Sequence, residues 1–165
     1  MKTRGLIAAG LVLVLVASNV AIVQKERILG TGTPMLLPLA TVDPRSLIQG
    51  DYMRLDYALT RTLDSTSHWP RDGAIVVTLD SLGVVEFVRR HQAAVPLARG
   101  EHLLRYRYRN GHYRVGTDAF HFQEGTANTY QRARYGELRV DDAGTSVLIG
   151  LRDASRVSMR QGGRP

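Results

Sequence analysis

Residues Gly5 to Val23 form the longest apolar stretch of the chain, with no charged side chain at nineteen consecutive positions. As an α-helix this stretch would be about 28 Å long, close to the ~30 Å hydrocarbon core of a bilayer. A cleavable signal peptide has a shorter apolar region and a small-x-small exit, neither of which fits here. The pattern therefore predicts an uncleaved transmembrane helix over residues 5–23, between a cytoplasmic N-terminus at 1–4 and a linker at 24–33.

Basic residues lie on both sides of the apolar stretch, Lys2 and Arg4 before it and Lys25 and Arg27 after it. The positive-inside rule then gives only a slight preference for a cytoplasmic N-terminus. Because most of the chain follows the stretch, we expect residues 34–155 to form a domain outside the bacterial cytoplasmic (inner) membrane, facing the periplasm or exterior. Residues 156–165 are expected to form a flexible tail.

From residue 34 onward, apolar residues fall in short runs between turn residues, a pattern that predicts strands. In Tyr52–Thr60 every second residue is apolar, which places Met53, Leu55, Tyr57 and Leu59 on an inward face. The runs predicted to be strands are Met35–Val42 (an edge strand, because it contains Pro38), Tyr52–Thr60, Ala74–Asp80, Gly83–Arg90, the two arms of Leu103–Val115, Glu137–Val140 and Thr145–Leu151.

The clearest local signal is Asn110-Gly111, which separates the two arms of Leu103–Val115. Both residues tolerate the positive φ of a type I′ turn, so the pattern predicts a hairpin. Alternation along the first arm places apolar and tyrosine side chains on one face and arginines on the other: Leu104, Tyr106 and Tyr108 against Arg105, Arg107 and Arg109.

One short helix is predicted over Gly125–Tyr135, which lacks helix-breaking residues. Seven or eight strands with this helix predict a mainly β fold, an antiparallel β-sandwich or small barrel in one domain. The N-terminal transmembrane helix would tether that domain.

The net charge of +7 and the pI of about 10.2 suggest a nucleic-acid partner. Residues 1–30 hold +3 of that charge, however, which leaves +4 on the domain, an ordinary value for a soluble surface. The predicted hairpin also puts tyrosines and arginines on opposite faces, a poor geometry for stacking on bases while contacting phosphates. We therefore predict no nucleic-acid partner.

No cofactor or metal is predicted either. Without cysteine, the chain cannot form a disulfide, a cysteine-ligated zinc site or an iron–sulfur cluster. Asp118, His121 and Glu124 would share one face of a helix and could then bind a metal. Phe120 and Phe122 alternate with His121, which favours a strand instead, and a strand puts His121 opposite the two carboxylates.

The segment Asp43–Tyr57 carries the most specific motif in the chain. Gly50, Asp51, Tyr52, Leu55 and Tyr57 fill a Gly-Asp-Tyr-x-x-Leu-x-Tyr pattern, and Asp43, Pro44 and Arg45 precede it. A second block, Gly116–Gly125, reads Gly-x-acidic-x-aromatic-x-x-x-Glu-Gly and ends in Glu124-Gly125. Over roughly residues 29–152 the chain resembles the GDYXXLXY family, with His121 in place of the family's usual aromatic and Gln123 in place of its usual proline.

The resemblance implies a bacterial, membrane-anchored protein of uncharacterised function, often encoded beside multi-spanning membrane proteins, and it supplies no catalytic residues. Physically, Gly50 gives a turn its backbone freedom, and Asp51 can cap nearby backbone N–H groups. The ten motif residues Asp43, Pro44, Arg45, Gly50, Asp51, Tyr52, Leu55, Tyr57, Glu124 and Gly125 are the candidate interaction site.

The leading hypothesis is a non-enzymatic accessory protein of the bacterial cell envelope that works with an integral membrane protein. The alternative is an envelope enzyme or small-ligand binder whose site lies near Asp51, Tyr52 and Glu124. Sequence leaves the oligomeric state open.

Overall fold

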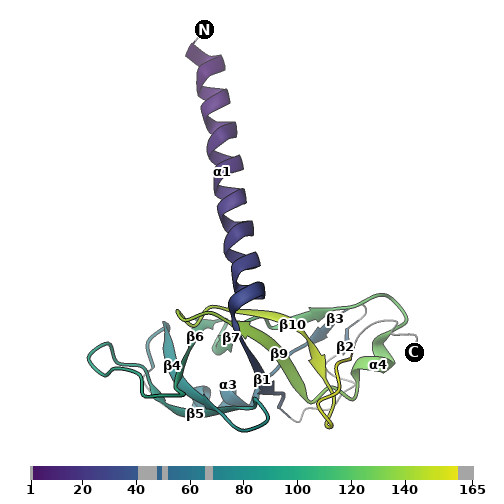
Figure 1. Cartoon of the computed structure of the whole chain (residues 1–165). Coiled ribbons are helices and arrows are strands. Elements are labelled where there is room, and N and C mark those ends of the chain that lie inside the picture. Colours follow the sequence, from purple (N-terminus) through teal and green to yellow (C-terminus); the bar gives the residue numbers. More distant parts are fainter. Residues whose placement is uncertain (1, 41–47, 50–51, 66–68, 160–165) are drawn as a thin grey trace.

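The computed structural model describes residues 2–40, 48–49, 52–65 and 69–159. It is mainly antiparallel β, with a half-barrel arrangement of sheets beneath one long N-terminal helix (Figure 1). The elements are α1 (Lys2–Thr31), β1 (Thr33–Pro38), β2 (Ile48–Gln49), β3 (Tyr52–Arg54), α3 (Ala58–Ser65), β4 (Asp72–Leu79), β5 (Val85–Arg90), β6 (His102–Arg109), β7 (His112–Val115), β8 (Ala119–His121), α4 (Ala127–Tyr130), β9 (Tyr135–Val140) and β10 (Ser146–Arg152).

Three small sheets share one apolar core. Their strand orders are β1-β9-β10, β2-β3-β8 and β5-β4-β6-β7, and all of these pairings are antiparallel. Side chains from each sheet and from α3 meet in the core, among them Leu37, Met53, Leu63, Ile75, Leu104, Leu138 and Leu151. The mainly β prediction is confirmed, and β1, which ends at Pro38, lies at a sheet edge as expected.

The predicted hairpin over Leu103–Val115 is confirmed as β6 and β7. Asn110 and Gly111 take φ values of 52° and 86°, which are the positive angles that the turn requires. On β6, Tyr106 is buried and Arg105 and Arg107 are exposed, as alternation predicted, whereas Tyr108, near the end of the strand, is 38% exposed. The final hairpin, β9 and β10, is also confirmed.

The strand predicted over Tyr52–Thr60 is wrong in its second half. Its inward positions are buried as expected, but β3 ends at Arg54 and helix α3 begins at Ala58. The reason is that Leu59 and Leu63, both buried, lie four residues apart, a spacing that puts them on one face of a helix. Leu59 fits both the alternation of a strand and the four-residue spacing of a helix, so the local pattern did not distinguish the two structures.

Three predicted boundaries also need correction. The linker expected at 24–33 is helical to Thr31, because this segment contains no proline and Gly32 N–H still donates to the carbonyl of Ile28 at 2.9 Å. The helix expected over Gly125–Tyr135 is a single turn, α4, because Tyr135 already pairs in β9. In the expected flexible tail, Ser158 forms a β-bridge with Arg152, and residues 160–165 lie outside the described part.

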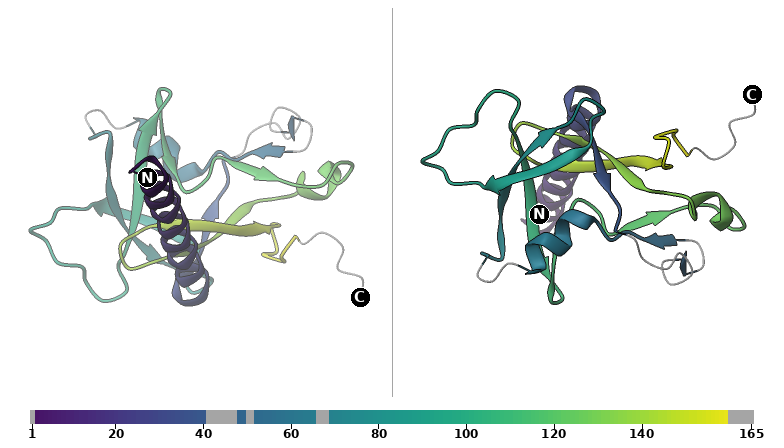
Figure 2. Two further views of the ribbon diagram at one scale, coloured as in Figure 1. Left: turned by 90° about the horizontal axis from the view of Figure 1, so that it is seen from above. Right: turned by 90° about the horizontal axis from the view of Figure 1, so that it is seen from below.

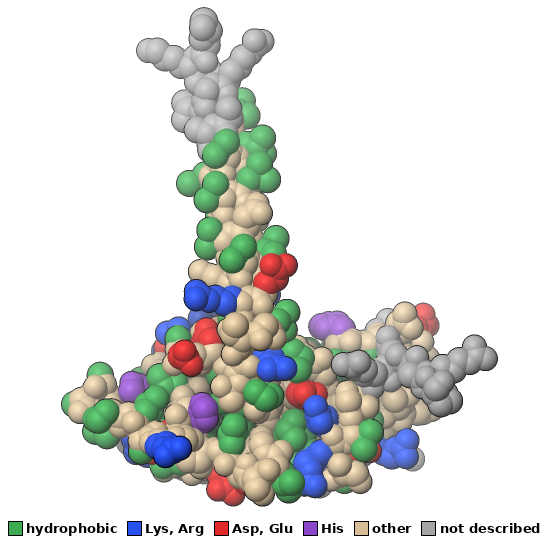
Figure 3. Space-filling view, in the orientation of Figure 1, with side chains coloured by type: hydrophobic (Ala, Val, Ile, Leu, Met, Phe, Trp, Pro, Cys, Tyr) green, Lys and Arg blue, Asp and Glu red, His purple; other side chains and the backbone are tan. Residues whose placement is uncertain are grey.

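Helix α1 rises away from the β domain (Figures 1 and 2). Its large apolar side chains from Leu11 to Val16 are 53–72% exposed, whereas Ile28, near its base, is buried against the domain. Figure 3 shows apolar side chains along the described part of this helix and basic ones near its base. Within the described part of the chain, no helix combines the length and the apolar character needed to cross a membrane.

Candidate functional site

A cleft of about 230 Å³ lies beside α3, between the end of the Gly50–Tyr57 motif and strand β7. Leu55 and Tyr57 bring the motif to this cleft. The lining residues are Arg54, Leu55, Asp56, Tyr57, Thr60, Arg61, Asp64, His112, Tyr113, Arg114, Val115, Thr117 and Asp118.

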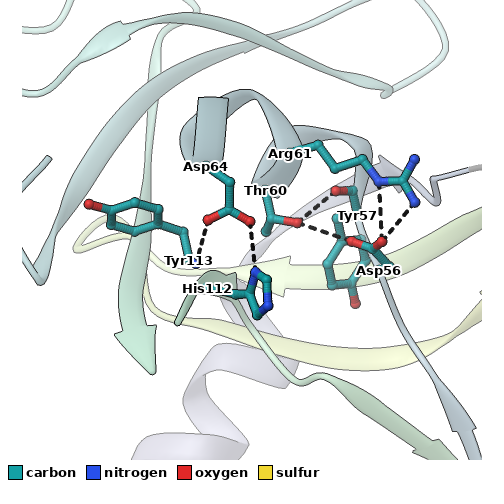
Figure 4. Close-up of polar contacts among 7 residues, drawn as sticks. All are labelled: Asp56, Tyr57, Thr60, Arg61, Asp64, His112 and Tyr113. Carbon is teal, nitrogen blue, oxygen red and sulfur yellow. Dashed lines mark hydrogen bonds and ion pairs between the residues drawn. The ribbon is translucent and has the colours of Figure 1, made fainter. Parts of the chain in front are cut away.

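The first turn of α3 is fixed by polar contacts of its own side chains (Figure 4). The Thr60 hydroxyl donates to the carbonyl oxygen of Tyr57 at 2.7 Å, and Thr60 is buried. Arg61 donates to one carboxylate oxygen of Asp56, from Nη2 at 2.9 Å and from Nε at 3.2 Å. These contacts hold the chain at the point where it changes from strand to helix.

Asp64 joins the end of α3 to β7, across nearly fifty residues of sequence. Its Oδ1 accepts the backbone N–H of Tyr113 at 2.9 Å, and its Oδ2 lies 3.3 Å from Nδ1 of His112 (Figure 4). Since β7 is the last strand of its sheet, this carboxylate satisfies a backbone donor that no further strand would pair.

The charges around the cleft are balanced. Arg114 forms an ion pair with Asp118, four residues further along the chain. In total the lining carries three arginines and three aspartates: Arg54, Arg61 and Arg114 with Asp56, Asp64 and Asp118. The described lining contains several hydrogen-bonding groups, among them the carboxylates of Asp56 and Asp64 and the hydroxyls of Thr60 and Thr117.

Tyr57 is a packing residue of the core. Its side chain is 2% exposed, and among the described residues its hydroxyl has no hydrogen-bond partner. Burial raises the pKa of this hydroxyl far above its usual range. Gly136 on β9 makes room for the ring, because a Cβ at that position would lie 2.8 Å from Cε1 of Tyr57.

The structure distributes the sequence-predicted site residues over several places. Leu55 and Tyr57 line the cleft, whereas Tyr52 lies on β3, where its ring centroid is 5.7 Å from that of His121. Glu124 and Gly125 are exposed in the turn after β8 and do not line the cleft. The remaining candidates, Asp43, Pro44, Arg45, Gly50 and Asp51, lie outside the described residues.

Sequence reasoning missed the polar residues of the cleft. Asp56 fell in the segment predicted as a strand, Tyr52–Thr60, and no functional role was predicted for Arg61, Asp64 or His112. The strand predicted around Asp118, Phe120 and His121 is confirmed as β8 from Ala119, and no group of three or more His, Asp or Glu converges in the described residues. A helical interpretation of residues 56–64 would have placed Asp56, Thr60 and Asp64 at four-residue intervals on one face.

Fold and cleft together define a small, mainly antiparallel β domain that follows a long N-terminal helix. A family model described as GDYXXLXY protein matches residues 14–151, so the chain belongs to the GDYXXLXY family. The match confirms the resemblance drawn from the two sequence motifs. No curated protein and no solved structure matches the chain.

Proposed function

We propose that this protein is a membrane-anchored accessory protein of the bacterial cell envelope, non-enzymatic, and that it works with an integral membrane protein. In this proposal α1 is a single-pass anchor in the cytoplasmic membrane, and the β domain is a small antiparallel barrel on its outer side. The observation that carries it is the long row of exposed apolar side chains on α1, which the β domain leaves uncovered.

Three considerations support this proposal. Exposed apolar surface of this extent is costly in water and favours burial in lipid or against another apolar helix. The uncharged stretch Gly5 to Val23 has the length of a bilayer core. The described cleft, with balanced charges and several hydrogen-bonding groups, fits a binding role.

A topology experiment tests the anchor. Alkaline phosphatase, which is active only outside the cytoplasm, is fused after Pro165, and the same reporter fused before Met1 is the matched control. We expect activity from the C-terminal fusion alone. An inactive C-terminal fusion at equal protein level would overturn the proposed location.

Purification in mild detergent tests the partner. We expect the tagged full chain to retain a specific multi-spanning protein at a fixed ratio. A variant in which residues 5–23 are replaced by a polyleucine span separates anchoring from recognition, because it remains in the membrane but loses any specific contact made by the helix. Recovery of no membrane protein by the natural chain would contradict the accessory role.

The cleft beside α3 favours a second candidate, the binding of a small polar ligand. Its test is a fragment library screened by ligand-observed NMR against the full chain in detergent. Thr117→Phe would fill the cleft rim, and Thr62→Phe, on an exposed position of α3 outside the cleft, is the control. Fragments that bind the natural chain and the control but not Thr117→Phe support this site, and equal binding to all three refutes it.

A further inference from the structure

A second depression, here called the arginine groove, lies between β6, β7 and the start of β10. Its volume is about 550 Å³. It is defined by four arginines, Arg105, Arg107, Arg109 and Arg114. Asn110, Thr145 and Ser146 add neutral polar groups to its lining.

The strand register places all four arginines on one face. Arg105, Arg107 and Arg109 alternate along β6 with Leu104 and Tyr106, which are buried in the core. Arg114 on β7 lies directly opposite Arg107, and the neighbouring pair, Tyr106 and Val115, points into the core. The arginine face is therefore the outer surface of this hairpin.

Positive charge on this face is only partly neutralised. Arg114 forms an ion pair with Asp118, and Arg107 lies 3.9 Å from Asp72, in a contact between two largely exposed side chains. Within the described part of the chain, Arg105 and Arg109 form no ion pair. Same-face neighbours on a strand are about 7 Å apart, so these like charges repel one another unless an anion lies between them.

The chemistry of the lining suits an anion with several oxygens, such as a phosphate. Guanidinium groups donate two parallel hydrogen bonds to the oxygens of a phosphate, with a geometry that lysine does not provide. The hydroxyls of Thr145 and Ser146 and the amide of Asn110 are neutral donors beside them. Such a mixture of several guanidiniums and hydroxyls resembles a site for a phosphate and its attached polyol.

The arginine groove lies on the same side of the domain as α1. Strand β10, which bounds the groove, also contacts α1. Figure 1 shows β6, β7 and β10 at the side from which the helix rises, and the view from below in Figure 2 shows α3 and β5 on the opposite side. From Val23 to Thr31 the helix extends about 12 Å, and the headgroup layer is roughly 5–7 Å thick, so the side of the domain from which the helix rises would lie about 5–7 Å from the headgroups.

We propose that the arginine groove binds the phosphate of an anionic phospholipid in the membrane that holds α1. The inference rests on the proposed anchoring of α1, since that anchoring presents the groove to the headgroups. Its consequence is a fixed orientation of the β domain, with the arginine face toward the bilayer and α3 toward the aqueous phase.

The test uses the full chain in a neutral maltoside detergent. Phosphatidylglycerol is titrated into the sample, and the thermal unfolding midpoint reports binding, because a ligand specific to the folded state raises it. Phosphatidylcholine and inorganic phosphate are the comparison ligands. The variant Arg105→Gln/Arg109→Gln removes the two arginines without ion pairs, and the control Arg99→Gln/Arg132→Gln removes two other exposed arginines with the same change of charge.

We expect phosphatidylglycerol to raise the midpoint of the natural chain and of the control, and phosphatidylcholine to leave both unchanged. An arginine near an anionic lipid surface strengthens binding about fivefold, so the groove variant should bind about 30-fold more weakly. An equal response of both double variants would overturn the site. A response to inorganic phosphate at the same concentrations would overturn the lipid as its source.

Carbonate extraction of membranes that carry the full chain reports on the anchor alone. If the chain remains in the membrane after extraction, the anchor is supported. If the groove variant then still responds to phosphatidylglycerol like the natural chain, the proposed lipid site is wrong although the anchor is not. A chain that carbonate releases would overturn the anchor, and with it the orientation that follows from the groove.

Discussion

The cleft beside α3 and the arginine groove share Arg114 and Asp118 at their border, and they differ in how their remaining charges are paired. In the cleft, Asp56 forms an ion pair with Arg61. Asp64 accepts a hydrogen bond from the backbone N–H of Tyr113 and contacts the ring of His112. In the groove, Arg105 and Arg109 lie on one face with no ion pair in the described residues. Charges that are paired within the fold contribute to its stability, whereas unpaired ones are free to meet a ligand. Substitutions should therefore destabilise the fold beneath the cleft and leave it nearly unchanged in the groove.

The largest effect is expected from Leu63→Ala, which removes a fully buried side chain of α3 beneath the cleft. The lost burial and the cavity should cost about 2–5 kcal/mol in the free energy of unfolding. Urea unfolding of the full chain in detergent measures this change, with Leu82→Ala, at a half-exposed leucine, as the control. A loss below about 1 kcal/mol would mean that α3 does not hold this side of the domain.

Asp64→Ala is expected to cost about 1–2 kcal/mol, because the N–H of Tyr113 loses its acceptor. Asp64→Asn keeps an acceptor oxygen and should recover most of that loss. Urea unfolding of the two variants separates the hydrogen bond from the charge. If both variants lose the same free energy, the negative charge of Asp64, which lies beside His112, stabilises the fold more than its hydrogen bond with the backbone of Tyr113 does.

Two tyrosine-to-phenylalanine substitutions sharpen the same contrast. Tyr113→Phe should cost about 1 kcal/mol, because its hydroxyl donates to the carbonyl oxygen of Trp69 at 2.8 Å. Tyr57→Phe should cost less or stabilise the fold, because the hydroxyl that it removes is buried and has no hydrogen-bond partner among the described residues. Urea unfolding at pH 7 measures both, and a larger loss for Tyr57→Phe would show that its hydroxyl does have a partner.

The Tyr57 hydroxyl also predicts an alkaline pH dependence. Burial raises its pKa in the folded state, so above pH 10 the unfolded chain releases a proton that the folded chain retains. The unfolded state then binds fewer protons, and the free energy of unfolding must fall as the pH rises through 10 and above. Tyr57→Phe should show a shallower fall between pH 9 and 11 in urea titrations. Parallel curves for the two proteins would contradict this assignment.

The smallest effect is expected from Arg105→Gln/Arg109→Gln without lipid. Removal of like charges that repel one another should change the free energy of unfolding by about 0.5 kcal/mol or less, in the stabilising direction. At 1 M NaCl the difference should vanish, because the screening length is about 3 Å. A loss above about 1 kcal/mol would show that these arginines stabilise the fold, and that the cleft and the arginine groove do not differ in this respect.

Local patterns in the sequence were sufficient for the hairpins. The turn at Asn110 and Gly111 depends on backbone angles that its own residues determine, and β9 and β10 are joined by a short turn. Helix α3 was missed because Leu55, Leu59 and Leu63 satisfy a period of two and a spacing of four at once. The switch from strand to helix is decided by the core that Leu63 enters, which local sequence does not describe.

The candidate site was harder to predict than the fold. Leu55 and Tyr57 were identified through their motif, but Asp64, which links this cleft to β7, contacts residues nearly fifty positions later in the chain. An aspartate that accepts a backbone N–H of a distant strand has no local signature. The arginine pattern on β6 was visible in the sequence, whereas the groove required the start of β10 to lie beside it.

The pairing of β1 with β9 has a consequence for the order in which the chain becomes structured. Thr33 pairs with Val140, so the first strand after α1 waits for 107 further residues before its partner exists. At a synthesis rate of about 5–20 residues per second, that interval is roughly 5–20 s. During this time Met35 and Leu37, which are almost fully buried in the finished domain, have no sheet to join. Until the last hairpin is made, β1 therefore exposes apolar side chains that the finished domain buries.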